Sequence, residues 1–200
     1  MMKLKREFYL GDTLEISKKL IGKMLVHKTP EGITKGMIVE AESYIGPFDK
    51  AAHSYNNRKS ERTKVQYKEG GYAYIYLIYG MYCCFNIVTS AKGNPECVLI
   101  RALEPIEGIE LMKKRRKTDD IKKLTSGPGK LCSAMGIDRG LYGCDLCGDE
   151  LYLEDYRDDL EVETSKRINV QYSEEANDYP WRFTAKGNKF VSVKVKKIKQ

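Results

Sequence analysis

A carboxylate, a histidine and a series of tyrosines occur close together between Gly36 and Tyr82. Glu42 lies in a segment of strand-like composition, His53 follows two alanines, and tyrosines recur from residue 72 to residue 82. A carboxylate can deprotonate water, and aromatic rings can stack on a planar base. These residue types predict hydrolysis of a bond beside a planar ring.

The charge of the chain suggests that this ring belongs to a polyanion. Lysine and arginine number 35 against 28 acidic residues, which gives a net charge of +7 and an isoelectric point near 8.9. Such a balance is compatible with a nucleic-acid surface without requiring one. A hydrophobic content of 42% provides for a core and argues against wholesale disorder.

The sequence gives no sign of export or of membrane insertion. The basic start lacks an apolar run behind it, and no segment reaches the roughly 20 apolar residues of a membrane span. We therefore expect a cytoplasmic protein whose six cysteines are reduced thiols. Cys144 and Cys147 have CxxC spacing, but no second pair or nearby histidine completes a metal site, so we expect no metal and assign this motif no role.

Strand patterns outnumber helix patterns and no linker divides the chain, which predicts one α+β domain over residues 1–200. Asp12 is the expected cap of a first helix that ends at Gly22. Residues 54–71 are polar and predict an exposed loop. The other expected elements are strands over 23–28, 33–44, 72–79, 85–89, 97–103 and 191–195, and helices over 105–116 and 127–135.

Each candidate residue also has a structural interpretation. On a strand, Glu42 shares a face with Glu40 and Tyr44, where it would be solvated or paired with a lysine. A lone histidine is more often structural than catalytic, which we expect of His27, and tyrosines on one strand face can simply pack a core. The segment 127–130 (GPGK) suits a backbone phosphate at a helix start, or an ordinary turn.

Six segments in this order and spacing resemble the alkyladenine, or 3-methyladenine, DNA glycosylase family over nearly the whole chain. They are 39–47 (VEAESYIGP), 51–54 (AAHS), 76–82 (YLIYGMY), 86–87 (NI), 98–105 (VLIRALEP) and 126–131 (SGPGKL). The resemblance implies a single mixed domain around a curved antiparallel β-sheet with flanking helices. It also implies an enzyme that flips alkylated or deaminated purines out of duplex DNA.

The resemblance implies a role for each matched residue. Glu42 is the general base that activates water, and Arg101 lies beside that water and the DNA backbone. Residues expected to bind the extruded base or the water are Tyr44, Ala51, His53, Tyr76, Asn86 and Ile168. Residues expected to contact the DNA are Tyr79 as the wedge in the vacated gap, with Met81, Gly127 and Lys130. The chain departs from the family pattern at Asn169, where relatives usually have glycine.

The expected reaction is a monofunctional hydrolysis that leaves an abasic site and needs no cofactor. The expected partner is double-stranded DNA with damaged purines, bound by a monomer. One alternative is a non-catalytic binding module for damaged DNA or RNA, which would not need Glu42 and Arg101. Another is a nucleoside hydrolase, which would need neither an exposed Tyr79 nor a positive surface.

Overall fold

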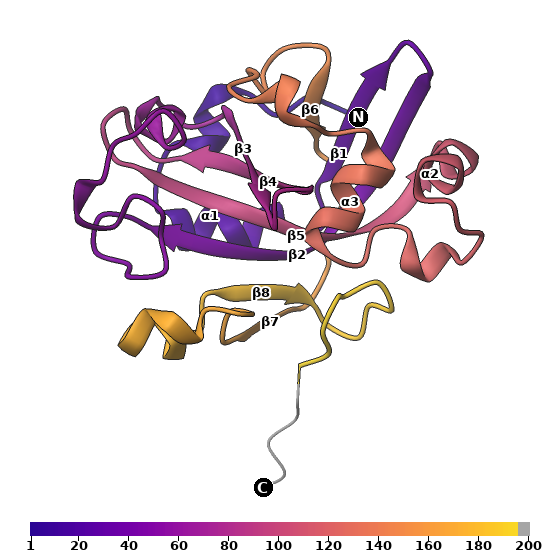
Figure 1. Ribbon diagram of the computed structural model, residues 1–200. Coiled ribbons are helices and arrows are strands. Elements are labelled where there is room, and N and C mark those ends of the chain that lie inside the picture. The colour runs from indigo at the N-terminus through magenta and orange to yellow at the C-terminus, as the bar shows by residue number, and fades with distance from the viewer. Residues whose placement is uncertain (196–200) are drawn as a thin grey trace, which may run out of the picture.

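The computed structural model describes residues 1–195, and its centre is an antiparallel β-sheet (Figure 1). Six strands lie side by side in the order β3-β4-β5-β2-β1-β6. In addition, β8 pairs with β2, and β7 pairs with β8. The strands are β1 (Met24–Thr29), β2 (Gly32–Ile45), β3 (Ala73–Ile78), β4 (Tyr82–Thr89), β5 (Glu96–Glu107), β6 (Leu151–Glu154), β7 (Val162–Ser165) and β8 (Arg182–Ala185). The predicted α+β class is confirmed.

Strand β2 is the longest, and it organises the sheet. One edge of β2 pairs with β5 along its length, with register shifts around Glu40 that mark β-bulges. The other edge pairs first with β1, from Gly32 to Met37, and then with β8, from Glu40 to Glu42. Figure 1 shows β8 continuing below β2 where β1 diverges. The acidic part of β2 therefore lies between β5 and β8.

Within the described residues, three α-helices cover the sheet: α1 (Thr13–Leu20), α2 (Ile109–Arg116) and α3 (Pro128–Met135). α1 buries Ile16 and Leu20 against β2 and β5, as its helical spacing requires. α3 packs on β4 and β5, and α2 packs on α3. Short 3₁₀ turns are η1 (Arg6–Tyr9), η2 (Tyr55–Asn57), η3 (Lys64–Tyr67), η4 (Ile121–Lys123), η5 (Arg139–Leu141) and η6 (Gln171–Asp178).

Three expectations about elements are wrong. Residues 54–71 are not simply an exposed loop, because they contain η2 and η3 and bury Val65 and Gln66. The segment 105–108 is not helical: β5 extends to Glu107, and α2 begins only after Gly108, whose φ is +75°. Residues 191–195 form no strand, and Ser192 instead donates from its backbone to a buried carboxylate.

Two other expectations hold. The six cysteines are free thiols, and His27 is buried with its Nδ1 2.7 Å from the Met135 carbonyl oxygen, which is a structural role. Within residues 1–195, none of the helices has the length and apolar character needed to cross a membrane.

Candidate active site

The backbone of β2 directs Glu42 away from α1. Ser43 Oγ lies 2.5 Å from Ser17 Oγ in α1, so Ser43 faces that helix. Successive residues of a strand point to opposite faces. Glu42 and Tyr44 therefore point together to the other face of the sheet.

The carboxylate of Glu42 is completely buried and held by three donors. Its Oε1 accepts a hydrogen bond of 2.7 Å from the backbone N–H of Ile168. Its Oε2 accepts a hydrogen bond of 2.9 Å from the Tyr44 hydroxyl and one of 3.4 Å from Arg101 Nη1. The Glu42 side chain is 0% exposed, so the alternative of a solvated residue or a lysine partner is wrong. A carboxylate buried in this way is fixed in position with its charge compensated.

The two side chains that contact Glu42 keep their protons. Burial and then the charge of Glu42 raise the pKa of Tyr44 well above its usual value, so its hydroxyl remains a donor. Burial alone would lower the pKa of Arg101, but the charges of Glu42 and Glu40 raise it above the usual range. Arg101 is therefore a permanent cation beside Glu42.

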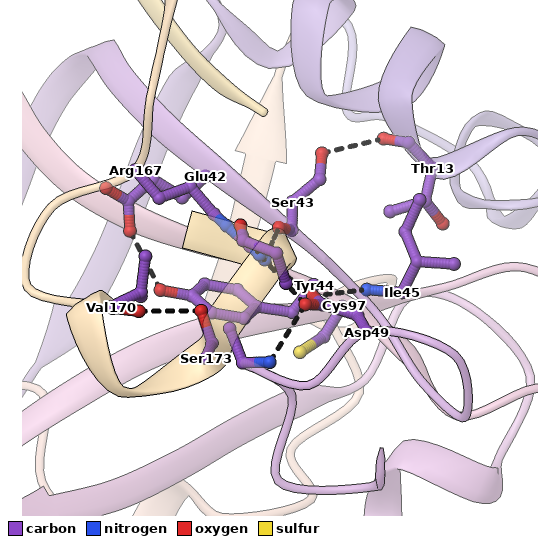
Figure 2. A network of polar contacts seen from close by, with 12 residues as sticks. Thr13, Glu42, Ser43, Tyr44, Ile45, Asp49, Cys97, Arg167, Val170 and Ser173 are labelled. Atoms are coloured by element: carbon purple, nitrogen blue, oxygen red, sulfur yellow. Dashed lines mark hydrogen bonds and ion pairs between the residues drawn. The ribbon is translucent and has the colours of Figure 1, made fainter. Parts of the chain in front are cut away.

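A second buried ion pair, between Arg167 and Asp49, lies beside Glu42 (Figure 2). Arg167 binds Asp49 through both terminal nitrogens, at 2.5 and 2.8 Å, and both side chains are 0% exposed. Arg167 Nη1 also donates to the Ser43 carbonyl at 2.9 Å. These bonds fix the segment after β7 on β2, so the next residue, Ile168, presents its N–H to Glu42.

The backbone after Ile168 takes a conformation that asparagine tolerates. Asn169 has a φ of +59°, in the left-handed region. Glycine reaches this region without cost, and asparagine is among the few other residues that visit it routinely. The departure from the family pattern at this position therefore leaves the local backbone intact.

A small pocket lies next to Glu42, and predicted base-binding residues line it. Its volume is about 40 Å³, which is close to that of one or two water molecules. The lining residues are Tyr44, Ala51, His53, Gln66, Tyr74, Tyr76, Asn86, Cys97 and Tyr172.

Hydrogen bonds fix the ring of His53 in this pocket. Its Nδ1 lies 2.8 Å from the Tyr74 hydroxyl, and its Nε2 lies 3.2 Å from Arg62 Nη2. A guanidinium can only donate, so Nε2 accepts and the ring proton is on Nδ1. Burial, together with the charges of Arg62 and Arg58, lowers the pKa of His53 to about 4. The imidazole is therefore neutral near pH 7.

Aromatic edges and an amide complete the pocket wall. The rings of His53 and Tyr76 are nearly perpendicular, at 86°, with centroids 4.7 Å apart. Asn86 Nδ2 donates a hydrogen bond of 3.0 Å to the Tyr74 carbonyl oxygen. This bond fixes the orientation of the Asn86 amide. Tyr74 is buried and packs as predicted, and it also contacts His53 and Asn86.

The pocket adjoins a groove of about 530 Å³ that has Tyr44, His53, Tyr76 and Tyr172 in common with it. One wall of the groove is the tip of the β3–β4 hairpin, and another is the N-terminus of α3. Arg101 and Ile168 also line the groove. The structure thus brings the predicted catalytic, base-binding and DNA-binding residues to one region of the molecule.

The hairpin tip projects aromatic and apolar side chains into solvent. Tyr79 is 80% exposed with a φ of +52°, and Gly80 follows with a φ of +71°. Met81 is 68% exposed at the same tip, but it is not among the residues that line the groove. A tight turn with two left-handed residues accounts for the outward direction of the Tyr79 ring.

The start of α3 presents backbone N–H groups to the groove. Gly127 precedes the helix with a φ of +139°, and no side chain caps the first turn. A Cβ on Gly129 would lie 3.1 Å from Cβ of Tyr82, so the glycine permits the hairpin and the helix to approach each other. Lys130 lines the groove beside these groups. The arrangement suits a phosphate group.

Sequence reasoning gave no role to several residues that shape the site. Glu40 was placed on the face of Glu42, but its contact with Arg101 was not foreseen. Asp49 and Arg167 have no local signal, since they are far apart in the sequence. Among the described residues, no group of three or more His, Cys, Asp or Glu side chains is arranged to hold a metal ion.

Comparison with known proteins gives consistent matches. The family described as Methylpurine-DNA glycosylase matches residues 7–189. A protein of Clostridium novyi is 52% identical, covering 97% of this chain and 100% of its own length. A protein of Alkaliphilus oremlandii is 54% identical, and the match covers 96% of this chain and 100% of the relative. A protein of Bacillus cereus is 52% identical, and the match covers 94% of this chain and 97% of the relative. Each is named “Putative 3-methyladenine DNA glycosylase”.

Proposed function

This chain belongs to the methylpurine-DNA glycosylase family, and from that premise we propose that Glu42 activates the water that hydrolyses the N-glycosidic bond of a damaged purine in DNA. The protein is accordingly a 3-methyladenine DNA glycosylase of base excision repair. The observation that supports Glu42 most directly is its buried carboxylate, which is held by Tyr44, Ile168 and Arg101 at the edge of an aromatic pocket.

The damaged nucleotide rotates out of the duplex so that its base reaches this pocket. Extrusion costs a few kcal/mol because the base loses its stacking and pairing. The exposed ring of Tyr79 offsets part of this cost by stacking in the gap that remains. The N-terminus of α3 and Lys130 bind the backbone phosphates beside the lesion.

The hydrolysis needs little acid catalysis when the base is alkylated. A positively charged purine leaves as a neutral base when the bond between C1′ and the ring nitrogen breaks. Glu42 accepts a proton from water, whose oxygen forms the new bond to C1′. Until that bond is complete, the negative charge of Glu42 also stabilises the developing positive charge on the sugar. The products are the free base and an abasic site, with no break in the strand.

The pocket selects for flat, electron-poor bases. Tyr44 and Tyr76 offer ring surfaces on which such bases stack well. His53 is uncharged near pH 7 and so does not repel a cationic base. Asn86, with its amide fixed by Tyr74, restricts which purines fit. Ala51 contributes through its backbone at the same wall.

The reaction is tested with duplexes that each contain a single lesion, either 7-methylguanine or hypoxanthine. We expect release of the free base, with strand cleavage only after alkali treatment. Glu42→Gln keeps the size of the side chain but cannot accept the proton, so release is abolished while lesion binding persists. Lesion binding by the wild type without any base release would instead indicate the binding module. Normal excision by the variant would contradict the role of Glu42.

The proposal extends to the organisation of the protein. We propose a single domain, since every strand of the part of the chain that the structure describes belongs to one sheet, and a cytoplasmic monomer that contacts damaged DNA through the groove. Light scattering during size-exclusion chromatography, with and without a lesion duplex, checks the monomer. A dimer in both samples would contradict it.

A further inference from the structure

A second acid on β2, Glu40, is buried as completely as Glu42 and has no role in the proposed chemistry. Its side chain is 0% exposed. Its Oε1 accepts from Arg101 Nε at 3.0 Å and from Arg182 Nε at 2.8 Å. Its Oε2 accepts from the backbone N–H of Ser192 at 2.6 Å. Burying a carboxylate so fully is costly unless each oxygen is satisfied, and here each is.

The partners of Glu40 come from three different parts of the fold. Arg101 belongs to β5, Arg182 to β8, and Ser192 to the segment that follows β8. Glu40 lies where β8 joins β2, so it links the C-terminal segment to the centre of the sheet. Ser192 Oγ adds a further donor to Oε1 at 2.9 Å.

Arg101 bridges the two acids. Its Nε contacts Glu40 while its Nη1 contacts Glu42, so the position of one end of the guanidinium determines the position of the other. The guanidinium is planar and rigid, which makes this coupling direct. The side chain has little other freedom, because it is only 9% exposed.

We propose that Glu40 is a positioning residue, which holds Arg101 against Glu42 and balances its charge so that Glu42 remains an effective base. This inference rests on the proposed function, because it concerns how the proposed base is tuned. Glu40 lines neither the small pocket nor the groove, so it acts through Arg101. Arg182 and Ser192, from the C-terminal part of the chain, hold the Glu40 carboxylate in place through their hydrogen bonds.

Charge balance gives the reason. Glu40 and Glu42 carry two negative charges, and Arg101 and Arg182 carry two positive charges. Burial alone would raise the pKa of Glu40, but Arg101, Arg182 and the Ser192 donors lower it, so Glu40 is charged at neutral pH. Without that charge, Glu42 alone would face the positive charge of Arg101.

The remaining groups near Glu42 leave this balance intact. Tyr44 is a neutral donor from the same strand. Arg167, from the segment after β7, is matched by Asp49. Burial raises the pKa of Tyr172, so it is neutral as well. The change at Glu40 therefore alters the net charge around Glu42 by one unit.

The test is the pH dependence of single-turnover base release. In Glu40→Gln we expect the rate to fall about ten- to one-hundredfold because Arg101 is less well positioned. We also expect the acid limb of the profile to move to lower pH by about one unit, because one of the two negative charges that balance Arg101 is removed. A purely structural role would lower the rate without moving the limb, and that result would overturn the proposal.

A second variant separates position from charge and serves if Glu40→Gln does not fold. Glu40→Asp keeps the charge but withdraws the carboxylate by one methylene, so the rate falls while the acid limb and the Kd for the lesion stay those of the wild type. A rate equal to that of the wild type would overturn the proposal.

The control is Glu96→Gln, at an acid on β5 that accepts from Thr13 in α1. This variant should have the same rate of base release as the wild type, and the acid limb of its pH profile should lie at the same pH. An inactive wild type would contradict the proposed function itself, whereas an active wild type with unchanged Glu40 variants would contradict only the role of Glu40.

Discussion

At the scale of single residues, the site depends on buried charges that balance one another. Glu40 and Glu42 are matched by Arg101 and Arg182, and Asp49 is matched by Arg167. Removing one partner of a buried pair typically costs about 3–5 kcal/mol, because the other charge stays buried without compensation. The same contacts also fix the position of the Glu42 carboxylate.

His53 provides a prediction about pH at this scale. Its pKa is lowered from 6.5 to about 4 by burial and by Arg62 and Arg58. We expect its Cε1–H NMR signal to titrate near pH 4, and the excision rate to show no inflection near 6.5. His53→Gln removes the signal and so assigns it. A midpoint near pH 6.5 would contradict the prediction.

The stability of the protein should follow the same titration. Between pH 6.5 and 4 the unfolded chain protonates this histidine while the folded protein leaves it neutral. The free energy of unfolding therefore decreases as the pH falls through this window. Urea titrations of the wild type and of His53→Gln check this: the variant should lose less stability over that range.

The sequence pointed to the candidate site residues but not to the ion pairs that hold them in place. Glu42, His53 and Tyr76 belong to short segments with a recognisable order, and the structure brings them to one pocket and its edge. Asp49 and Arg167 are separated by 118 positions, and neither has a local pattern that indicates the other. Long-range ion pairs of this kind depend on the whole fold, so a single sequence does not reveal them.

At the scale of elements, the β3–β4 hairpin and α3 form two walls of one groove. Both were predicted, since glycine and proline mark their turns: Gly80 at the hairpin tip, and Gly127 with Pro128 at the helix start. The extension of β5 to Glu107 was not predicted, because pairing with β2 prevails over the local helical pattern. The short strands β6, β7 and β8 were missed, as each depends on a distant partner for its pairing.

The hairpin tip allows a prediction about base extrusion. Tyr79 is 80% exposed, so Tyr79→Ala should leave the fold unchanged. Loss of stacking in the duplex should weaken lesion-specific binding by about 1–3 kcal/mol, or roughly 5- to 150-fold. The Kd values for lesion and undamaged duplexes, both measured in the Glu42→Gln background, give this difference without turnover.

A matched control comes from another exposed tyrosine. Tyr156 is 40% exposed and does not line the groove, so Tyr156→Ala should leave the preference for the lesion intact. Equal preference in the two variants would rule out Tyr79 as the wedge.

At the scale of the whole molecule, the location of the charge matters more than its total. A net charge of +7 is only a weak indication of nucleic-acid binding. Among the described residues, the groove is lined by four cationic side chains, Arg62, Arg101, Arg116 and Lys130, and by no acidic one. The walls of the groove therefore favour a polyanion even though acidic residues are abundant elsewhere in the chain.

This location predicts which lysines determine the salt dependence of DNA binding. Each phosphate contact contributes about −0.9 to the slope of log K against log salt concentration. Lys130→Gln should therefore reduce the slope by about one for undamaged duplex. Lys186 is ion-paired with Glu161 outside the groove. Lys186→Gln therefore makes the same change in net charge without removing a contact with a DNA phosphate. Fluorescence anisotropy between low and physiological salt measures both slopes. If the two variants lowered the slope equally, total charge rather than the groove would govern binding.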